Sequence, residues 1–362
     1  MVKSWLFDIF NYPYDSRPEG LDPDLVQDEY DWHLETWVQA EDLGYDGVFF
    51  SEHHFTAYNM SPSPNLLVAS LAQRTSRMHL GVMCNVTAFH NPRRLAEETA
   101  MLDYLTHGRL EVGFGRGSDD LEFKKEGFPL EDTRAWFEES LDLMEKAWHQ
   151  PRFTHHGRFF DYDDASIYPR PKNAPEVWVT ALSPSTVSWA AAKGYRIAMS
   201  FVPPAGLAGM RKAYEEAAVA AGRTPSADKI AVLRQAFVAD TDEQARELAE
   251  PALDHVFKLF KRAAVPEDVD NLAKGYEGYS SFFRPFVTGG GVTFDDLVAS
   301  GAVVVGSPAT VRDQLVAQAE EIGCGHLINW FSFGQLTKEQ TQRSVELYAK
   351  EVAPALRSLT LR

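Results

Sequence analysis

Apolar and polar positions follow a regular alternation along this chain. Short apolar runs are each followed by a longer segment in which apolar residues recur every three to four positions, which are the patterns of buried strands and amphipathic helices. Phe137, Leu141, Met144 and Trp148, for example, form a helical stripe that indicates core packing rather than a functional aromatic cluster. Strands are predicted at residues 5–10, 47–50, 78–86, 110–114, 177–181, 196–201, 230–237 and 326–331. Helices are predicted at residues 26–43, 64–75, 93–106, 134–148, 185–193, 207–221, 242–262 and 338–356.

This alternation of strands and helices predicts the fold class. It favours an α/β protein built as a parallel (β/α)8 TIM barrel with insertions, and a chain of 362 residues suits that fold. An open, doubly wound sheet shows the same alternation and remains the alternative, because a count of strands does not show closure. No Pro- or Ser-rich linker divides the chain, so a single domain over residues 1–362 is expected.

Two segments interrupt the rhythm. A short hairpin is predicted at about 158–162, and residues 266–301 form a variable insertion. The insertion is a lid over an apolar ligand, or an ordered segment that packs on the barrel or on a second subunit; the sequence supports both equally. It contains Tyr276, Tyr279, Phe282, Phe283, Phe286 and the triple glycine 289–291.

Composition narrows the classes of partner. The hydrophobic fraction of 44% supports a large core, and 35 basic against 52 acidic residues argue against a nucleic-acid or anionic-membrane partner. Cys84 and Cys324 lie far apart without metal-ligand spacing, which suits a reducing compartment. The sequence shows neither a signal peptide nor an apolar run long enough to span a bilayer, so a soluble cytoplasmic protein is expected.

Candidate chemistry follows the predicted strand at 47–50. Glu52, His53 and His54 come directly after it, and barrel active sites lie at the C-terminal ends of the strands. An imidazole there can give or take a proton near neutral pH. A buried carboxylate–histidine pair or a metal-ligand pair are the alternatives. Adjacent residues on a strand point to opposite faces, so the two histidines are not expected to share a metal, and no metal site is predicted.

Anion-binding features follow three further elements. Glycines surround Arg116 in residues 113–117, although the spacing differs from a dinucleotide fingerprint; Arg134 opens a predicted helix, and Ser183 and Thr186 lie where another helix begins. Taken singly, each is also explained by a structural arginine or an ordinary helix cap. Guanidinium groups and helix N-termini both bind phosphate, so the three features together predict a phosphorylated ligand in the barrel mouth.

Motifs in a fixed order give the chain a family resemblance. They are Glu-His-His-Phe from residue 52, Ser-Pro-Asn-Leu-Leu from 63, Arg-Thr-Ser-Arg from 74, His-Asn-Pro-x-Arg-x-Ala-Glu-Glu from 90, Met-Leu-Asp from 101, Gly-Arg from 108 and Gly-Phe-Gly-Arg-Gly from 113. This set resembles the bacterial luciferase-like flavin monooxygenases. Residues 305–311 resemble the family's motif before its last barrel helix. The resemblance extends from about residue 7 to residue 355 and thins at 266–301.

The resemblance implies roles for individual residues. His53 is the expected active-site histidine, with His54 beside it and Glu52 orienting a histidine or forming a structural pair. Luciferases have a cysteine at the position of Gly115, so light emission is not expected here, whereas oxygenation is. The expected cofactor-binding residues are Arg116 and Arg134 on the phosphate, Ser183, Ser185 and Thr186 beside it, and Met83, Cys84 and Asn85 along the flavin ring, with a non-prolyl cis peptide between Met83 and Cys84.

The resemblance also implies an activity. It indicates a two-component FMN-dependent monooxygenase in which a separate NAD(P)H flavin reductase supplies reduced FMN, O2 adds to form a flavin hydroperoxide, and a small organic substrate is oxygenated, usually in a homodimer or higher homo-oligomer. A deazaflavin-dependent hydride transferase on the same barrel is the first alternative, although no extra basic cluster is present for its longer acidic tail. A non-catalytic flavin-binding protein is the second. The sequence does not identify the substrate.

Overall fold

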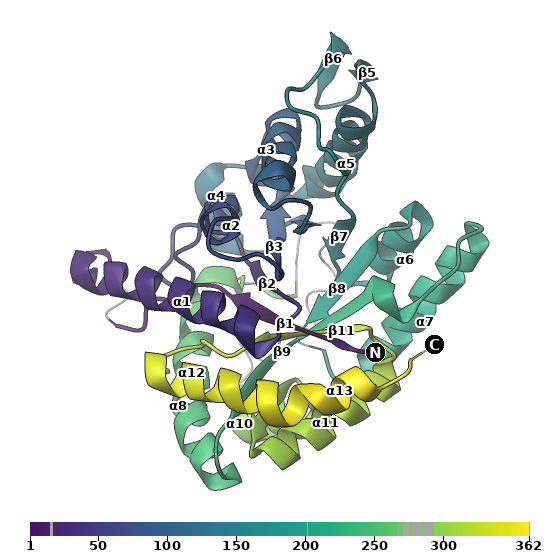
Figure 1. Cartoon of the computed structure of the whole chain (residues 1–362). Coiled ribbons are helices and arrows are strands. Elements are labelled where there is room, and N and C mark those ends of the chain that lie inside the picture. Colours follow the sequence, from purple (N-terminus) through teal and green to yellow (C-terminus); the bar gives the residue numbers. More distant parts are fainter. Residues whose placement is uncertain are drawn as a thin grey trace.

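The computed structural model describes residues 1–14, 17–200, 202–266, 268–270, 276, 284 and 293–361. Its parallel strands form a closed barrel surrounded by helices (Figure 1). Pairing of β8 with β9 and of β11 with β1 closes the ring, which confirms the predicted TIM barrel and excludes the open sheet. The barrel strands are β1 (Lys3–Asp8), β2 (Gly47–Phe50), β3 (His79–Val86), β4 (Leu110–Gly115), β7 (Val177–Thr180), β8 (Arg196–Ser200), β9 (Ile230–Val238) and β11 (His326–Trp330).

A ninth strand that the sequence pattern did not predict extends this sheet. β10 (Val303–Gly306) pairs with the second half of β9, whereas β8 pairs with its first half. The register places Ser200 beside Leu233 and Val303 beside Gln235, so β10 takes over along β9 where β8 ends. Such a short apolar run carries little periodicity, so only its pairing with β9 identifies it as a strand.

The helices begin and end at residues that suit those positions. Asn91, Ser183 and Ser307 each accept a hydrogen bond from the backbone N–H three residues later, and each is followed by proline. Gly44 and Gly194 end helices in the left-handed conformation that glycine adopts without strain. The helices are α1 (Pro23–Leu43), α2 (Pro64–Ala72), α3 (Pro92–Leu105), α4 (Asp120–Glu126), α5 (Thr133–His149), α6 (Pro184–Lys193), α7 (Pro204–Ala220), α8 (Asp242–Ala264), α10 (Phe294–Ala299), α11 (Pro308–Ile322), α12 (Lys338–Leu347) and α13 (Ala353–Ser358).

Two predicted elements differ in the structure. The single terminal helix predicted at 338–356 is interrupted between α12 and α13 by a π-helical turn, Tyr348–Val352, just before Pro354, which has no N–H to continue the hydrogen-bond pattern. The predicted hairpin at 158–162 covers mainly the turn, because the strands are β5 (Phe153–His156) and β6 (Asp161–Ala165). Glu139 of α5 holds this turn by accepting backbone N–H groups of residues 158–160.

Several predictions fall outside the described residues. They concern Phe201 at the end of its strand and, in the insertion, Tyr279, Phe282, Phe283, Phe286 and residues 289–291. Tyr276 and α10 are described. Among the described helices, none combines the length and the apolar character that crossing a bilayer requires.

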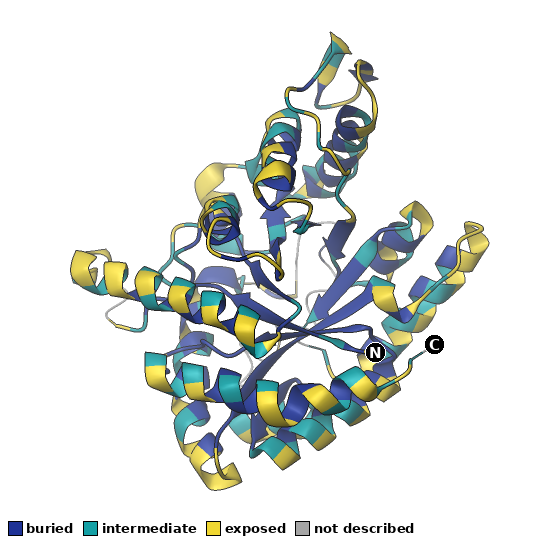
Figure 2. Ribbon diagram, in the orientation of Figure 1, coloured by how far each residue is buried: buried dark blue, intermediate teal, exposed yellow. Residues whose placement is uncertain are grey.

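The core has two parts, one inside the barrel and one between the barrel and its helices. Trp5, Phe49, Trp178 and Ile328 fill the interior, because successive side chains of a strand point to opposite faces. Leu6 of the same strand as Trp5 packs outward against the helices. Figure 2 shows the result, with buried strands surrounded by helices whose outer faces are exposed.

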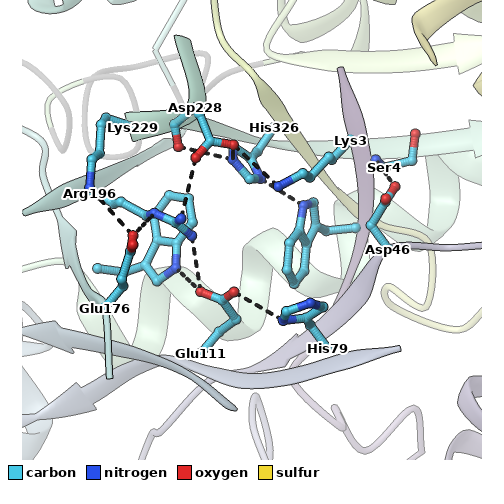
Figure 3. A network of polar contacts seen from close by, with 12 residues as sticks. Lys3, Ser4, Asp46, His79, Glu111, Glu176, Arg196, Asp228, Lys229 and His326 are labelled. Carbon is cyan, nitrogen blue, oxygen red and sulfur yellow. Dashed lines mark hydrogen bonds and ion pairs between the residues drawn. The ribbon is translucent and has the colours of Figure 1, made fainter. Parts of the chain in front are cut away.

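A polar network closes the N-terminal end of the barrel (Figure 3). The Trp5 indole donates to Nδ1 of His326 at 2.9 Å, and the Trp178 indole donates to Glu111 at 2.7 Å. Arg196 also contacts Glu111, at 3.3 Å. These contacts offset the cost of removing the indole, imidazole and carboxylate groups from water. In barrels of this kind the N-terminal end contributes to stability, and the active site lies at the C-terminal end.

Candidate active site

A pocket lies at the C-terminal ends of the barrel strands, where the sequence predicted the chemistry. Its lining comes from strand ends that are far apart in the sequence. Phe7, Met83, Ile328 and Trp330 are among its apolar lining residues, and polar side chains complete the lining. Of the residues that the sequence singled out, the pocket wall includes Glu52, His53, Met83, Cys84, Arg116 and Thr186. The wall also contains Tyr58, Asp119, Glu122 and Thr180, which the sequence did not single out.

Glu52 is a buried carboxylate between two histidines. It accepts hydrogen bonds from Nε2 of His54 at 2.9 Å, from Nε2 of His90 at 2.8 Å, and from the Val86 N–H at 2.9 Å. Burial alone would raise the pKa of Glu52, but these hydrogen bonds lower it below the ordinary 4.5. The hydrogen bond to Glu52 also raises the pKa of His54. Glu52 is thus ionised and fixes the orientation of both imidazoles.

His53 faces a different pair of carboxylates. Its Nδ1 lies 3.0 Å from Asp119 Oδ2 and 3.1 Å from Glu122 Oε1, and both carboxylates are buried at the start of α4. Burial of the imidazole would lower its pKa, but the two carboxylates raise the pKa of His53 well above 6.5. The two adjacent histidines therefore have separate partners, so they do not converge on one metal ion. His53, Asp119 and Glu122 are themselves residue types that bind metals, with ligand atoms within 4.8 Å of one another.

The end of β3 approaches β4 closely beside the pocket. The peptide bond between Met83 and Cys84 is cis, as the family resemblance implied. A Cβ atom at Gly115 would lie 2.3 Å from the Cys84 sulfur and 2.7 Å from the Thr180 hydroxyl, so only glycine fits there. Burial raises the pKa of the Cys84 thiol to about 12, which keeps it neutral. Asn85 is fully buried and reaches the Gly113 carbonyl at 3.5 Å, so its side chain is not part of the pocket wall.

Arg116 lies where β4 gives way to α4. Its guanidinium donates to the hydroxyl of Thr133 at 3.1 Å and lies 4.5 Å from the centre of the Tyr276 ring. The Tyr276 hydroxyl contacts the same Thr133 hydroxyl at 3.0 Å and donates to the Gly117 carbonyl at 3.0 Å. Tyr276 of the insertion therefore contacts Arg116, the arginine that the sequence predicted to bind phosphate.

The remaining predicted anion-binding residues gather at the start of α6. Arg134 donates to the Thr186 hydroxyl at 3.2 Å and pairs with Glu138 in its own helix. The Ser183 hydroxyl lies 3.1 Å from the hydroxyls of both Ser185 and Thr186. Tertiary structure thus brings two arginines and a hydroxyl-rich helix start to the same side of the barrel mouth, although Arg134, Ser183 and Ser185 lie outside the pocket wall itself.

Of the pocket residues that the sequence analysis did not predict, only Asp119 and Glu122 are marked by a local sequence pattern. Asp119 and Glu122 stand three positions apart at the start of a helix, directly after the glycine-rich turn at 113–117. This is the spacing of a helix-capping pair, so the sequence alone explains both residues as a cap and does not indicate a place in the pocket. Nothing local marks Tyr58 or Thr180, whose places in the wall depend on how the strands come together.

Comparison with known proteins adds independent information. A family model described as luciferase-like monooxygenase matches residues 11–326. An uncharacterised protein y4wF of Sinorhizobium fredii is 30% identical over 300 residues, which cover 81% of this chain and 82% of that protein.

Two characterised proteins also match. The oxygenase component of the flavin-dependent trigonelline monooxygenase of Acinetobacter baylyi is 26% identical, over 90% of this chain and 89% of that protein. The oxygenating constituent of 3,6-diketocamphane monooxygenase from Pseudomonas putida, a type II Baeyer–Villiger monooxygenase solved with FMN, is 25% identical and superposes with a TM-score of 0.77 over 99% of each chain.

Proposed function

This chain belongs to the luciferase-like monooxygenase family, and from that premise we propose that it is the oxygenase component of a two-component FMN-dependent monooxygenase. A separate NAD(P)H flavin reductase provides the reduced flavin, and O2 and a small organic compound are the other substrates. The names of two relatives, an oxygenase component and an oxygenating constituent, support this division of labour.

The observation that carries the proposal is the division of the barrel mouth into regions of different chemistry. Arg116, Arg134 and the start of α6 form a cationic, hydrogen-bonding side. Apolar residues such as Phe7 and Trp330 line the pocket, and His53 is also part of its wall. A phosphate with a flat aromatic ring attached needs this combination.

The donor set of the chain fits FMN. Arg116 and Arg134 would bind the phosphate with charge-assisted hydrogen bonds, while the Ser183, Ser185 and Thr186 hydroxyls complete its coordination. The wall formed by Met83 and Cys84 would receive the ring. Bound in reduced form, FMN supplies the electron pair that activates O2.

His53 is the proposed catalytic residue of the chain. It is part of the pocket wall, whereas its Nδ1 is occupied by Asp119 and Glu122, so its Nε2 is the atom that exchanges a proton with bound reactants. Glu52 and His54 are proposed to support the site next to His53 in the chain. Glu52 accepts hydrogen bonds from both His54 and His90 and so holds these imidazoles in place. The apolar wall excludes water from the reaction.

The proposal extends to assembly and location. We expect a homodimer or higher homo-oligomer in the cytoplasm, where Cys84 and Cys324, which are both free, remain reduced. The negative net charge of −17 argues against nucleic-acid or anionic-membrane partners.

Anaerobic binding tests the cofactor. Titrations with reduced FMN, oxidised FMN and a reduced deazaflavin are compared, and oxygen is then admitted while the near-ultraviolet spectrum is recorded. We expect preferential binding of reduced FMN and a transient absorption band on oxygenation. Tight deazaflavin binding without an oxygen reaction would instead indicate hydride transfer. Binding of flavin followed only by peroxide release, across a panel of substrates, would favour a non-catalytic flavin-binding protein.

The same assay tests the role of His53. The substitution His53→Ala is expected to leave FMN bound while product formation per bound flavin falls by about 100-fold or more, because general acid–base catalysis contributes about 10²–10⁴-fold. His156→Ala is the matched control, since this exposed histidine pairs with Asp161 in the hairpin, away from the pocket. Loss of FMN binding with unchanged product per bound flavin would contradict the assigned role.

A further inference from the structure

The start of α4 contains a helix-capping pattern that does not cap its helix. Asp119 is the N-cap residue, and Glu122 stands three positions later. In such a pair the first side chain normally accepts an N–H of the first turn, and the glutamate reaches back to the N-cap N–H. Here the Asp119 side chain accepts no capping hydrogen bond, and the Glu122 carboxylate accepts the His54 N–H at 2.6 Å.

Both displaced carboxylates meet at the same imidazole nitrogen. Nδ1 of His53 lies 3.0 Å from Asp119 Oδ2 and 3.1 Å from Glu122 Oε1. Only about 1% of each acidic residue is exposed, so both carboxyl groups are held away from water. Buried charges persist when an opposite charge and hydrogen bonds compensate them. A positively charged His53 is the compensating group that this geometry provides.

The other titratable groups near His53 do not supply that charge. The Tyr58 ring packs edge-on against His53 with ring centres 5.3 Å apart, and burial together with Asp119 and Glu122 raises the pKa of its hydroxyl. Burial raises the pKa of the Cys84 thiol to about 12, so it is neutral as well. His54, on the other side, is bound to Glu52.

We propose that Asp119 and Glu122 are positioning residues that hold His53 as an imidazolium, with Nδ1–H directed at the carboxylate pair and Nε2–H directed into the pocket. Within the part of the chain that the structure describes, Nε2 of His53 has no hydrogen-bond partner. The site therefore presents a proton donor rather than a base. This inference deepens the proposed function, on which its catalytic meaning rests.

The direction of the pKa shifts agrees with this geometry. Burial would lower the pKa of His53, yet the two carboxylates raise it well above 6.5. Burial raises the pKa of Glu122 above 4.5, although His53 opposes that rise. Both shifts reflect the close contact between His53 and the buried carboxylates, and the raised pKa of His53 favours the imidazolium at neutral pH.

A direct measurement is the NMR titration of the full-length protein with 15N-labelled histidine, in the presence of EDTA and without flavin. The His53 signal is assigned by its disappearance in His53→Gln. We expect His53 to be protonated at pH 7 in the wild type. Asp119→Asn and Glu122→Gln should each lower its pKa, and the double variant should bring it below 6.5, because burial then acts alone.

Asp120→Asn is the matched control, because Asp120 adjoins Asp119 but pairs with Lys124 at 2.6 Å. It should leave the titration of His53 unchanged. A neutral His53 at pH 7 in the wild type, or equal shifts in Asp120→Asn and Asp119→Asn, would overturn the inference. A parallel titration without EDTA completes the test. If the His53 signal responds to pH only in the sample with EDTA, the three side chains bind a metal ion and the inference is overturned as well.

Different results would contradict the inferred protonation state of His53 and the proposed function. If His53 titrates as inferred and His53→Gln still forms product normally, the pairing stands and the catalytic role of His53 is wrong. If the double variant loses product formation mainly at high pH, where its His53 is neutral, both stand. Circular dichroism of each variant identifies any that do not fold.

Discussion

At the residue scale, Gly115 lets the Cys84 and Thr180 side chains pack closely where β3 and β4 meet beside the pocket. Its missing side chain leaves the space that the Cys84 sulfur and the Thr180 hydroxyl fill, with contacts of 2.3 and 2.7 Å to the position of a Cβ atom. Neither neighbour is the far end of a flexible chain, so the site has little freedom to adapt. A glycine here is thus a requirement of packing.

We predict that Gly115→Ala lowers the free energy of unfolding by about 1–3 kcal/mol, the usual cost of adding a methyl group to a filled site. Chemical denaturation measures the change. Cys84→Ala in the same chain should recover most of the loss, because it removes the closest atom. Gly209→Ala is the control, since nothing lies within 4 Å of its Cβ position. An equal loss of unfolding free energy in Gly115→Ala and Gly209→Ala would contradict this account of Gly115.

Arg116 is the residue on which proposed phosphate binding depends most. Its guanidinium is held by Thr133 and the Tyr276 ring, so it is already oriented before a ligand arrives. We predict that Arg116→Met weakens FMN binding by about 10- to 100-fold, since a hydrogen bond to a charged group contributes about 1.5–3 kcal/mol.

Isothermal titration with reduced FMN measures this effect. Arg152→Met serves as the control, because Arg152 pairs with Asp164 in the hairpin and is largely exposed. Riboflavin, which lacks the phosphate, should bind the wild type and Arg116→Met equally. An equal loss for both flavins would show that Arg116 acts elsewhere than on the phosphate.

At the scale of elements, the two ends of the barrel strands have different tasks. The C-terminal ends and their loops hold the pocket, whereas the N-terminal ends hold a polar network around Glu111. Burial would raise the pKa of Glu111, but His79, Arg196 and the Trp178 indole lower it below 4.5. The ionised carboxylate of Glu111 therefore contributes to stability.

This contribution depends on pH with a definite sign. Because the pKa of Glu111 is lower in the folded than in the unfolded chain, its contribution is present above pH 4.5 and is lost as the pH falls through the folded value. We predict that Glu111→Gln has a lower Tm than the wild type at pH 7 and that the difference narrows towards pH 3.

Differential scanning fluorimetry across this range measures the effect. Asp164→Asn is the control, because this exposed carboxylate pairs with Arg152 outside the barrel, so its Tm should follow that of the wild type at every pH. A difference between Glu111→Gln and the wild type that is constant from pH 7 to pH 3 would contradict the assigned role.

At the scale of the whole molecule, α2 and α3 present apolar side chains to solvent. These helices pack side by side, and Leu66, Met101 and Tyr104 are 71%, 52% and 50% exposed. Exposed apolar residues on adjoining helices can mark a contact between subunits. We therefore place the proposed contact between subunits on this surface of α2 and α3.

We predict that the wild type is a dimer and that Leu66→Glu/Met101→Glu is a monomer, because charges at the centre of an apolar contact are costly to bury. Size-exclusion chromatography with light scattering measures the mass. Val219→Glu is the control, since Val219 is 63% exposed on α7, away from this surface. A monomeric wild type, or a double variant that remains dimeric, would show that this surface is not the contact.

The sequence alone determined much of the fold and several members of the candidate site. Short apolar runs located the barrel strands, and helical periodicity with a closing glycine located the helices, because these patterns involve residues that are near in the chain. The order of motifs also indicated the family, which the match over residues 11–326 confirms.

Only the tertiary structure decided the partners of those residues. His53 and His54 are adjacent, yet one binds Asp119 and Glu122 and the other binds Glu52. In the sequence alone, Asp119 and Glu122 have the spacing of a helix-capping pair, and only the structure shows their contact with His53. Met83 and Cys84 help to form the pocket wall, whereas Asn85 does not. Local patterns report how a segment folds, but distances between strand ends depend on barrel closure, which no single segment encodes.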